Sequence, residues 1–376
     1  MANYTPIATL QRNVRTSAPS PEGGLPSAEP SVVQGVIRGV ETELAAFVSA
    51  QSAGLVRLDP ALESLAIAVR DAVLGAGKRI RPVFAYWGWR AGGGQEPVEA
   101  VLPALAAIEL MHAFALVHDD VMDRSDTRRG RPTAHRSLAA THRRARLTGD
   151  AEWFGDAAAV LAGDLCLVWA DQLMGRARVA PATLMAARCA YDRMRIEAIA
   201  GQFLDVLGDC APIWTVERAL RTARLKTAGY TVIRPLHYGL ALAGAADGPL
   251  SAAFTRYGIA AGEAFQLRDD LLGAFGHPEV TGKPVGDDLA QGKPTVLLQI
   301  ARAQATPAQL RDLDHEPRAR SRVADAVRAT GAAEQVEEMI SERVMESRRA
   351  LDDAPLDAGV RDALIRLAET IAWRSA

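Results

Sequence analysis

Apolar residues recur along most of the chain at the spacing of an α-helix, in segments rich in alanine and leucine. Alternating β-branched strands are not evident, so the pattern predicts an all-α fold. Two interruptions stand out: 141–150 is predicted to be a basic loop, and the Gly-, Pro- and Asp-rich segment 273–292 an ordered loop over a site. Helices are predicted over residues 32–53, 62–74, 97–120, 156–176, 182–206, 216–242, 250–272, 294–303, 307–313, 321–329, 332–351 and 356–374.

Three carboxylates, Asp119, Asp120 and Asp123, stand where the predicted helix 97–120 ends, and Arg128 and Arg129 follow them. Asp119 and Asp123 are four residues apart, so they share one face of a helix and repel each other unless a cation lies between them. Oxygen ligands in this arrangement suit Mg²⁺ that substrate phosphates also hold, and the arginines offer planar forks to the same phosphates. A solvated helix end of mixed charge is the alternative interpretation of this segment alone.

A second apolar helical run ends in paired aspartates, Asp269 and Asp270, with Gln266 one turn before Asp270. Lys283 and Lys293 follow, and lysine is a compact charge suited to phosphate. Two acidic clusters that face each other across a cavity would hold a diphosphate through several metal ions. They would also stabilise the charge that develops when diphosphate leaves.

Further polar candidates lie in otherwise apolar or glycine-rich surroundings, and each is weak evidence by itself. The segment 75–82 carries glycines and three cations within four residues, Lys78 and Arg81 among them, but its spacing does not match a P-loop. His112 lies two helical turns before Asp119, where a core histidine is the alternative. The remaining candidates are two polar pairs in predicted helices: Lys226 with Thr227, and Gln202 with Asp205.

Taken together, these segments closely resemble the polyprenyl synthetase family, the trans-isoprenyl diphosphate synthases, over about residues 35–370. The motifs occur in the family's order: GKRIRP, DDVMD with its RRG, GQFLD, KT, FQLRDD and GKP…GK. The resemblance implies an isoprenoid-synthase fold, which is a large single-domain helical bundle around a central active-site cavity. It also implies elongation of an allylic diphosphate by isopentenyl diphosphate, with release of pyrophosphate. By likeness, Mg²⁺ is the cofactor, with three ions in each active site, and the enzyme is a homodimer.

The resemblance also implies a role for each motif residue. Asp119, Asp123 and Asp269 would ligate Mg²⁺, and Arg128, Lys226 and Lys283 would contact the allylic diphosphate. Lys78, Arg81, His112 and Arg129 would hold isopentenyl diphosphate. Thr227 and Gln266 would lie near the reacting carbons, and Asp205 would join a network of metal-bound water and lysine. Supporting roles fall to Asp120, Asp270, Gln202 and Lys293.

Two positions carry more particular expectations. Phe114, five residues before Asp119, with the small Ala115 after it, resembles the archaeal-type geranylgeranyl diphosphate synthases, so a twenty-carbon product is expected; core packing is the alternative role for Phe114. Gly273 stands four residues after Asp269, where the family's second motif usually closes with an aspartate. This departure leaves less negative charge in the second cluster.

Composition adds limits rather than chemistry. The 376 residues are 49% hydrophobic with a formal net charge of −2, so no basic field favours nucleic acid as a partner. The three cysteines lack metal-type spacing and fit a reducing cytoplasm. Residues 1–30 are expected to be a disordered tail and 31–376 the synthase domain, and charges interrupt the apolar runs, so no transmembrane segment is predicted.

Three alternatives remain open. One is a farnesyl or longer-chain polyprenyl diphosphate synthase. Another is a catalytically silent regulatory subunit, which the departure at Gly273 mildly favours. The third is a class I terpene cyclase, which shares an aspartate-rich metal site but has no need of Lys78, Arg81 and Arg129, because it binds one diphosphate rather than two.

Overall fold

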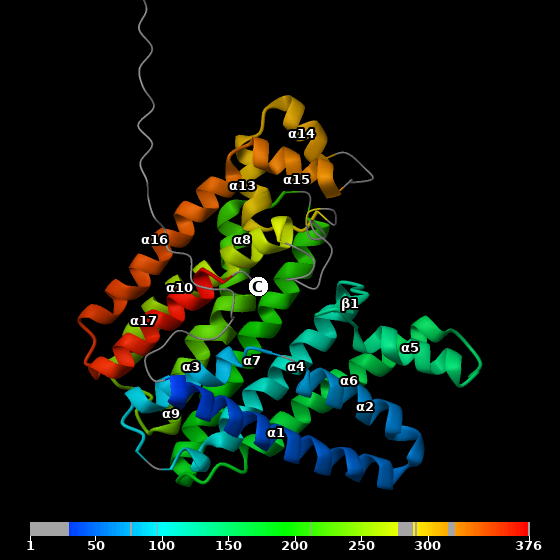
Figure 1. Ribbon diagram of the computed structural model, residues 1–376, viewed down its shortest axis with the longest axis vertical. Helices are drawn as coiled ribbons and strands as arrows, with labels where there is room; N and C mark the ends of the chain where they lie inside the picture. The colour runs from blue at the N-terminus through cyan, green and yellow to red at the C-terminus, as the bar shows by residue number, and fades with distance from the viewer. Residues whose placement is uncertain are drawn as a thin grey trace, which may run out of the picture.

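The structure is a computed structural model, and it describes residues 30–75, 77–95, 97–211, 213–276, 289, 292–314 and 320–374. The described chain is almost entirely helical, which confirms the all-α prediction (Figure 1). Short helices η1 (Pro60–Leu62) and η2 (Val98–Ala100) precede α2 and α4, and one two-stranded hairpin is formed by β1 (Thr127–Arg128) and β2 (Arg131–Pro132). The longer helices are α1 (Pro30–Leu58), α2 (Glu63–Leu74), α3 (Ile80–Ala91), α4 (Leu102–Met122), α5 (Ala134–Arg144), α6 (Ala151–Met174), α7 (Pro181–Cys210), α8 (Val216–Ala223), η3 (Arg224–Ile233), α9 (Arg234–Leu242), α10 (Leu250–Phe275), α13 (Val296–Gln304), α14 (Pro307–Asp314), α15 (Arg320–Ala329), α16 (Ala332–Asp352) and α17 (Ala358–Ala372).

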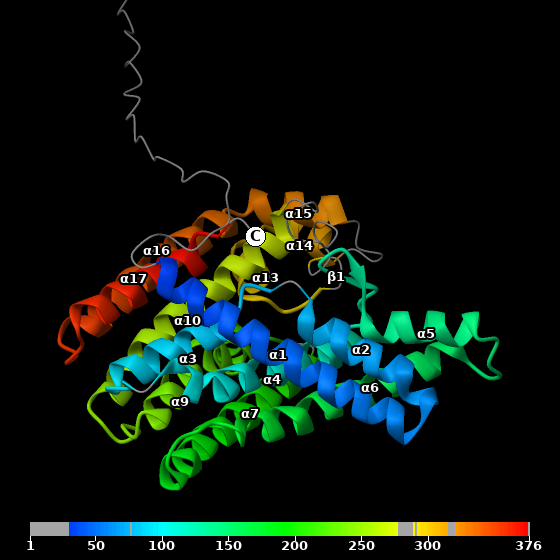
Figure 2. The ribbon, with the colours of Figure 1, turned by 60° about the horizontal axis from the view of Figure 1, so that its bottom comes forward.

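Helix α4 is the centre of the bundle. Its residues 104–111 are all buried, most of them completely, so this helix has no solvent-facing stripe through that stretch. It packs along α6 and also contacts α1, α3, α5 and α7, and Figures 1 and 2 show it enclosed by these helices. This enclosure holds the C-terminal end of α4, where the first acidic cluster stands, at the middle of the molecule.

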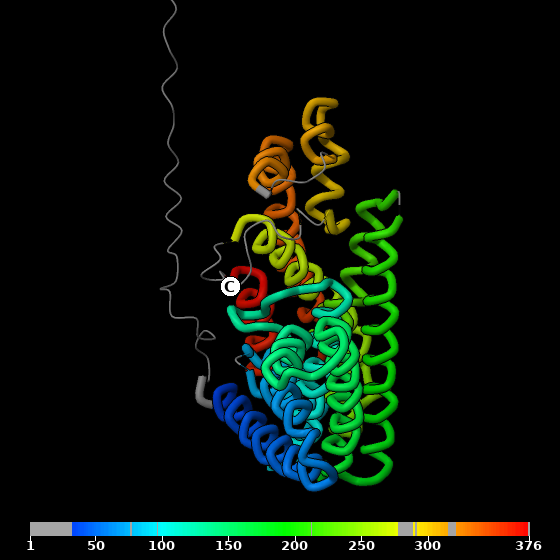
Figure 3. The backbone as a smooth tube through the Cα atoms, turned by 90° about the vertical axis from the view of Figure 1, so that its right-hand side faces the viewer, coloured from blue at the N-terminus to red at the C-terminus, as the bar shows by residue number. Residues whose placement is uncertain are grey.

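A second, smaller hydrophobic cluster lies where α13, α15 and α16 pack beside the C-terminal half of α10. Helix α10 belongs to both clusters: Phe254 and Tyr257 pack in the main core, whereas Leu267 and Leu271 pack in the smaller one. Figure 3 shows the two groups of helices at opposite ends of the long axis, with the green helix α7 running along one side. The second acidic cluster on α10 therefore lies at the junction of the two clusters.

The structure corrects three details of the predicted elements. Helix α3 was not predicted, because its residues 81–89 are buried on every side and show no helical amphipathic period. The segment 141–150 is a loop only after Arg144, since its first residues complete the polar helix α5. Helix α6 begins at Ala151 rather than at 156, because the Asp150 carboxylate caps the helix by accepting from two backbone N–H groups.

The predicted tail 1–30 and most of the predicted loop 273–292 lie outside the described residues. Two described helices, α4 and α6, are long and apolar enough to cross a membrane by length and composition alone. The apolar window of α4 is 67% buried within the protein, as expected for a core helix, whereas that of α6 is only 44% buried. Helix α6 therefore presents an apolar face outward.

Candidate active site

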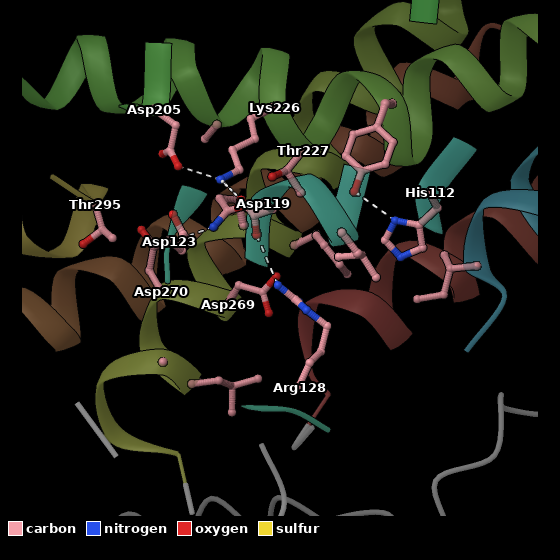
Figure 4. A pocket seen from close by; sticks show the side chains of 18 of the residues that line it. His112, Asp119, Asp123, Arg128, Asp205, Lys226, Thr227, Asp269, Asp270 and Thr295 are labelled. Atoms are coloured by element: carbon pink, nitrogen blue, oxygen red, sulfur yellow. Dashed lines mark hydrogen bonds and ion pairs between the residues drawn. The ribbon is translucent and has the colours of Figure 1, made fainter. Parts of the chain in front are cut away.

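A cavity of about 790 Å³ opens between the C-terminal ends of α4 and α7, η3 and the C-terminal half of α10. Most of the predicted site residues among the described ones line it or touch residues that do. Figure 4 shows that the aspartates of both acidic clusters and Lys226 project into the same space from different helices. The two motifs, far apart in the sequence, thus form one site.

The first acidic cluster stands at the less favourable end of its helix. Asp119 is in the last turn of α4 and Asp123 is its C-cap, where the negative end of the helix dipole disfavours carboxylates by roughly 0.3–1 kcal/mol each. Asp205 from α7 joins them, and one carboxylate oxygen from each lies within 4.8 Å of the others. Gln202 Nε2 donates to Asp119 Oδ1 at 3.1 Å. Three carboxylates at this spacing are hard oxygen ligands that fit Mg²⁺ shared with substrate phosphates.

Lys226 bridges this cluster. Its Nζ donates to Asp119 Oδ1 at 2.9 Å and to Asp205 Oδ2 at 2.5 Å. Burial alone would raise the pKa of Asp119, but Lys226 and then Arg128 outweigh burial and hold that pKa below its ordinary value. The pKa of Asp123 is raised, first by burial and then by the charge of Asp119. The two carboxyls of the motif therefore differ in how readily they take up a proton.

The remaining cations of this wall also rest on carboxylates. Lys293 pairs with Asp123. Arg128 Nη2 lies 2.7 Å from Asp120 Oδ1 and 3.2 Å from Asp119 Oδ2. The buried Asp120 thus holds Arg128 in place, which is a supporting role.

All four lysines of the chain, Lys78, Lys226, Lys283 and Lys293, fall in the predicted motifs, against 39 arginines among the 43 basic residues. Of these, Lys283 lies outside the described residues. The other three line the cavity. Lysine is used in this chain at the cavity and nowhere else in the part that the structure describes.

The structure presents the second cluster on α10 with two different partners. Asp269 forms an ion pair with Arg374, whose guanidinium carbon lies 3.9 Å from the centroid of the Phe265 ring. Asp270 accepts from Gln266 Nε2 at 2.9 Å and from the backbone N–H of Val296 at 3.1 Å. Asp270 therefore orients Gln266 and fixes the start of α13, whereas Asp269 faces a cation in the cavity.

The opposite wall carries a group of basic residues, Lys78, Arg81, His112 and Arg129, which we call the basic half-site. Arg79 has a left-handed backbone (φ 48°), is buried, and donates to Glu109 Oε2 at 2.7 Å and to the carbonyls of Val73 and Gly75. It serves to pin the loop before α3. Lys78 and Arg81, on either side of it, line the cavity, as does His112 from α4.

Arg129 reaches this half-site from the hairpin. The turn between β1 and β2 consists of Arg129 (φ 53°) and Gly130 (φ 72°), the left-handed pair of a type I′ turn. A left-handed backbone conformation costs an arginine roughly 1 kcal/mol of strain. The turn carries this strain and directs the Arg129 side chain to the half-site. A Cβ placed on Gly77 would lie 3.1 Å from Arg129 Nη1, so glycine leaves room for the guanidinium beside the loop.

Phe114 and Ala115 are the residues from which the twenty-carbon product was predicted. Phe114 is 9% exposed and packs edge-on against His118, with 4.8 Å between the ring centroids, and neither it nor Ala115 lines the described cavity. The lining residues of that stretch are Ala113 and Leu116. The role of Phe114 in setting the length of the product stays a prediction.

Among the cavity residues that sequence reasoning missed, Arg374 and Tyr230 contact predicted site residues. Arg374 stands just after α17, and only the packing of α17 against α3 and α10 brings it to Asp269. Tyr230 lies in η3, a π-helix, and contacts both Arg81 and His112. No local motif marks Arg374; a polar phenol three residues after the KT pair was the available signal for Tyr230.

A helical bundle whose central cavity joins clustered carboxylates to several lysines and arginines defines a metal-assisted site for phosphorylated substrates. A sequence model described as Polyprenyl synthetase matches residues 63–330, and the chain belongs to this family, whose members are Mg²⁺-dependent prenyltransferases acting on isoprenyl diphosphates.

Relatives with different products match the chain to a similar degree. It is 33% identical to the geranylfarnesyl diphosphate synthase of Aeropyrum pernix over 80% of this chain and 92% of that protein. It is also 33% identical to the octaprenyl diphosphate synthase of Escherichia coli, over 80% and 87%. A crystal structure of geranylgeranyl pyrophosphate synthase from Corynebacterium glutamicum, complexed with isoprenyl diphosphate and magnesium, superposes with a TM-score of 0.85. That match has 40% identity and covers 89% of this chain and 97% of that one.

Proposed function

We propose that the chain condenses isopentenyl diphosphate with an allylic diphosphate to give all-trans geranylgeranyl diphosphate and pyrophosphate. This proposal rests on one observation: two groups of charged residues line opposite walls of the same cavity. One wall holds Asp119, Asp123 and Asp205 with Lys226, and the other holds the basic half-site of Lys78, Arg81, His112 and Arg129. Two diphosphates can be bound there, one through metal and one through cations alone.

The residues divide the reaction between them. Asp119, Asp123 and Asp269 would hold the Mg²⁺ ions, three in number by the family likeness, which would neutralise charge on the leaving diphosphate. Arg128, Lys226 and Lys293 then hold that diphosphate as the C–O bond of the allylic substrate breaks. Enclosure by apolar helices keeps water from the allylic cation.

Thr227 and Gln266 line the cavity between the two half-sites and offer oxygen dipoles to the cation. The alkene of isopentenyl diphosphate attacks and forms the new C–C bond. A proton then leaves the adduct, and the released pyrophosphate accepts it. Holding both substrates in one cavity supplies a large part of the rate.

The twenty-carbon product is the more specific part of the proposal. Phe114 beside the small Ala115 supports it, as does the 40% identity to the Corynebacterium geranylgeranyl pyrophosphate synthase. The relatives named as geranylfarnesyl and octaprenyl synthases make a longer product the competing outcome.

A cytoplasmic homodimer is proposed as the working form. Exposed apolar side chains lie on α6 and α7, with Leu161 59%, Val168 53%, Ile196 67% and Phe203 67% exposed. Apolar surfaces of this kind mark protein contacts, and a second copy of the chain would cover them. Sedimentation should show a dimer, and Leu161→Glu should give a monomer; a monomeric parent chain would contradict the proposal.

The test of the activity is product analysis with purified chain, Mg²⁺, isopentenyl diphosphate and, in turn, dimethylallyl, geranyl and farnesyl diphosphate. Geranylgeranyl diphosphate as the main product supports the proposal. Because Asp269 has lost its i+4 carboxylate to Gly273, a silent regulatory subunit is the second candidate, and a chain that binds substrates without turnover would favour it. Consumption of an allylic diphosphate without isopentenyl diphosphate would instead indicate a terpene cyclase.

A further inference from the structure

Tyr230 lies between two members of the basic half-site. Its phenol oxygen accepts a hydrogen bond from Arg81 Nη2 at 2.7 Å and lies 3.3 Å from His112 Nδ1. The dashed line at His112 in Figure 4 marks the second contact. The Arg81 guanidinium carbon is 4.2 Å from the centroid of the Tyr230 ring, and only 8% of the tyrosine is exposed.

The phenol fixes the Arg81 fork on two sides. One nitrogen, Nη2, is occupied by Tyr230 Oη and by Thr231 Oγ1 at 3.0 Å. The ring beneath the guanidinium holds its plane. Nε is buried without a hydrogen-bond partner among the described residues, and Arg81 lines the cavity, so the accessible part of its fork faces a ligand there.

The same phenol fixes the protonation pattern of His112. Its oxygen accepts from the Arg81 cation, and we infer that its own proton is donated to His112 Nδ1, since this arrangement keeps the phenol proton away from the guanidinium. A neutral imidazole that accepts at Nδ1 carries its proton on Nε2, and burial followed by the charges of Arg81 and Arg129 lowers the pKa of His112 well below its ordinary value, which keeps the ring neutral. His112 therefore offers an N–H donor to an anion rather than a lone pair that would repel it.

We propose that Tyr230 is a positioning residue for isopentenyl diphosphate, which sets both the plane of Arg81 and the Nε2–H tautomer of His112 for the diphosphate of that substrate. The inference rests on the proposed function. It adds a residue from the π-helix η3 that also carries Lys226 and Thr227, so one irregular turn serves both substrates.

The test is Tyr230→Phe, which removes the oxygen and keeps the ring. KM for isopentenyl diphosphate should rise roughly tenfold, the weight of a hydrogen bond to a charged group, while kcat and the KM of the allylic substrate change less than about twofold. In ¹⁵N NMR spectra of the imidazole, His112 should be the Nε2–H tautomer in the parent and a mixture in the variant. Tyr191→Phe is the matched control, because Tyr191 is fully buried on α7 and its hydroxyl has no partner among the described residues.

A second variant separates the effect on the Arg81 guanidinium from the effect on the His112 tautomer. Thr231→Val removes the other acceptor of Arg81, so it should raise the same KM without altering the His112 tautomer. An unchanged KM and tautomer in Tyr230→Phe would overturn the inference, as would an equal rise of KM for both substrates. Failure of the proposed function is a distinct result, since a parent chain that does not turn over can still be examined for its His112 tautomer and for binding of pyrophosphate.

Discussion

Replacing Lys226 by methionine tests the electrostatic design of the cavity directly. The Lys226 ammonium lies 2.9 Å from Asp119 Oδ1 and 2.5 Å from Asp205 Oδ2, and its side chain is 26% exposed. At an effective dielectric constant of about 20, each contact corresponds to an attraction of about 6 kcal/mol before desolvation is subtracted. Removing one partner of a buried ion pair destabilises a protein by roughly 3–5 kcal/mol, because the other charge is left uncompensated.

The expected loss lies at the lower end of that range, about 3 kcal/mol in metal-free buffer. The carboxylates are partly hydrated, and Asp119 can take up a proton once Lys226 is gone, because Lys226 is the main group that holds its pKa low. Excess Mg²⁺ stabilises both proteins by RT ln(1 + [L]/Kd), so the gap between variant and parent should narrow by about 1.4 kcal/mol for each tenfold by which the variant binds the metal more tightly. The variant should bind Mg²⁺ more tightly than the parent, since the ammonium no longer competes for Asp119.

The assay is urea unfolding followed by circular dichroism, with chelator and with excess Mg²⁺, together with calorimetric titration of the metal. Arg221→Met is the control, an exposed cation on the preceding helix α8 whose loss should change the free energy of unfolding by less than about 0.5 kcal/mol. The reasoning is refuted if Lys226→Met is as stable as the parent in chelator, or if its deficit is the same with Mg²⁺.

Three other predictions concern the same cavity. Burial and the charge of Asp119 raise the pKa of Asp123, so a proton competes with the metal at pH values above the ordinary 3.8. The Mg²⁺ affinity measured by calorimetry should therefore fall as the pH is lowered towards that value, and Asp123→Asn should bind Mg²⁺ weakly with a flatter pH profile. A parent affinity that is independent of pH would contradict this prediction. An amine-reactive reagent should inactivate the enzyme by modifying the cavity lysines, and Lys78 should react first because burial and Arg374 lower its pKa. Mg²⁺ with pyrophosphate should slow the labelling of Lys78, as followed by peptide mapping. Labelling of Lys78 that these ligands do not slow would argue against its anion-binding role. Phe114→Ala should lengthen the product on chromatography, whereas an unchanged product profile would assign Phe114 to core packing with His118 alone.

The sequence was sufficient to predict those parts of the site whose residues lie close together along the chain. Asp119 and Asp123 are one helical turn apart, so their common face could be predicted without knowing the fold. The long amphipathic or apolar helices were predicted for the same reason. The partnership of Lys226 with Asp119 and Asp205 required the tertiary fold, because α4, α7 and η3 meet only in three dimensions.

The features that were missed depend on burial and on long-range packing. Helix α3 is covered on all sides, which erases the period that identifies a helix at a surface. No local pattern predicted the π-helical form of η3, which packs closely against its neighbours: a Cβ on Gly201 would lie 2.3 Å from the backbone nitrogen of Lys226, and one on Gly262 would lie 2.3 Å from the Ala228 Cβ. Arg374 is 105 residues from its partner Asp269, and no pattern near either residue links them.

The cations and the carboxylates of the cavity are paired with one another. Lys226, Lys293 and Arg128 each form ion pairs with carboxylates of the first cluster, and Arg374 forms one with Asp269. These contacts keep the acidic groups from repelling one another, but they also occupy the cations that a diphosphate needs. Mg²⁺ at the carboxylates would release the cations toward the diphosphate, and the diphosphate would in turn complete the metal's ligands. By linkage each ligand must then tighten the binding of the other by the same factor.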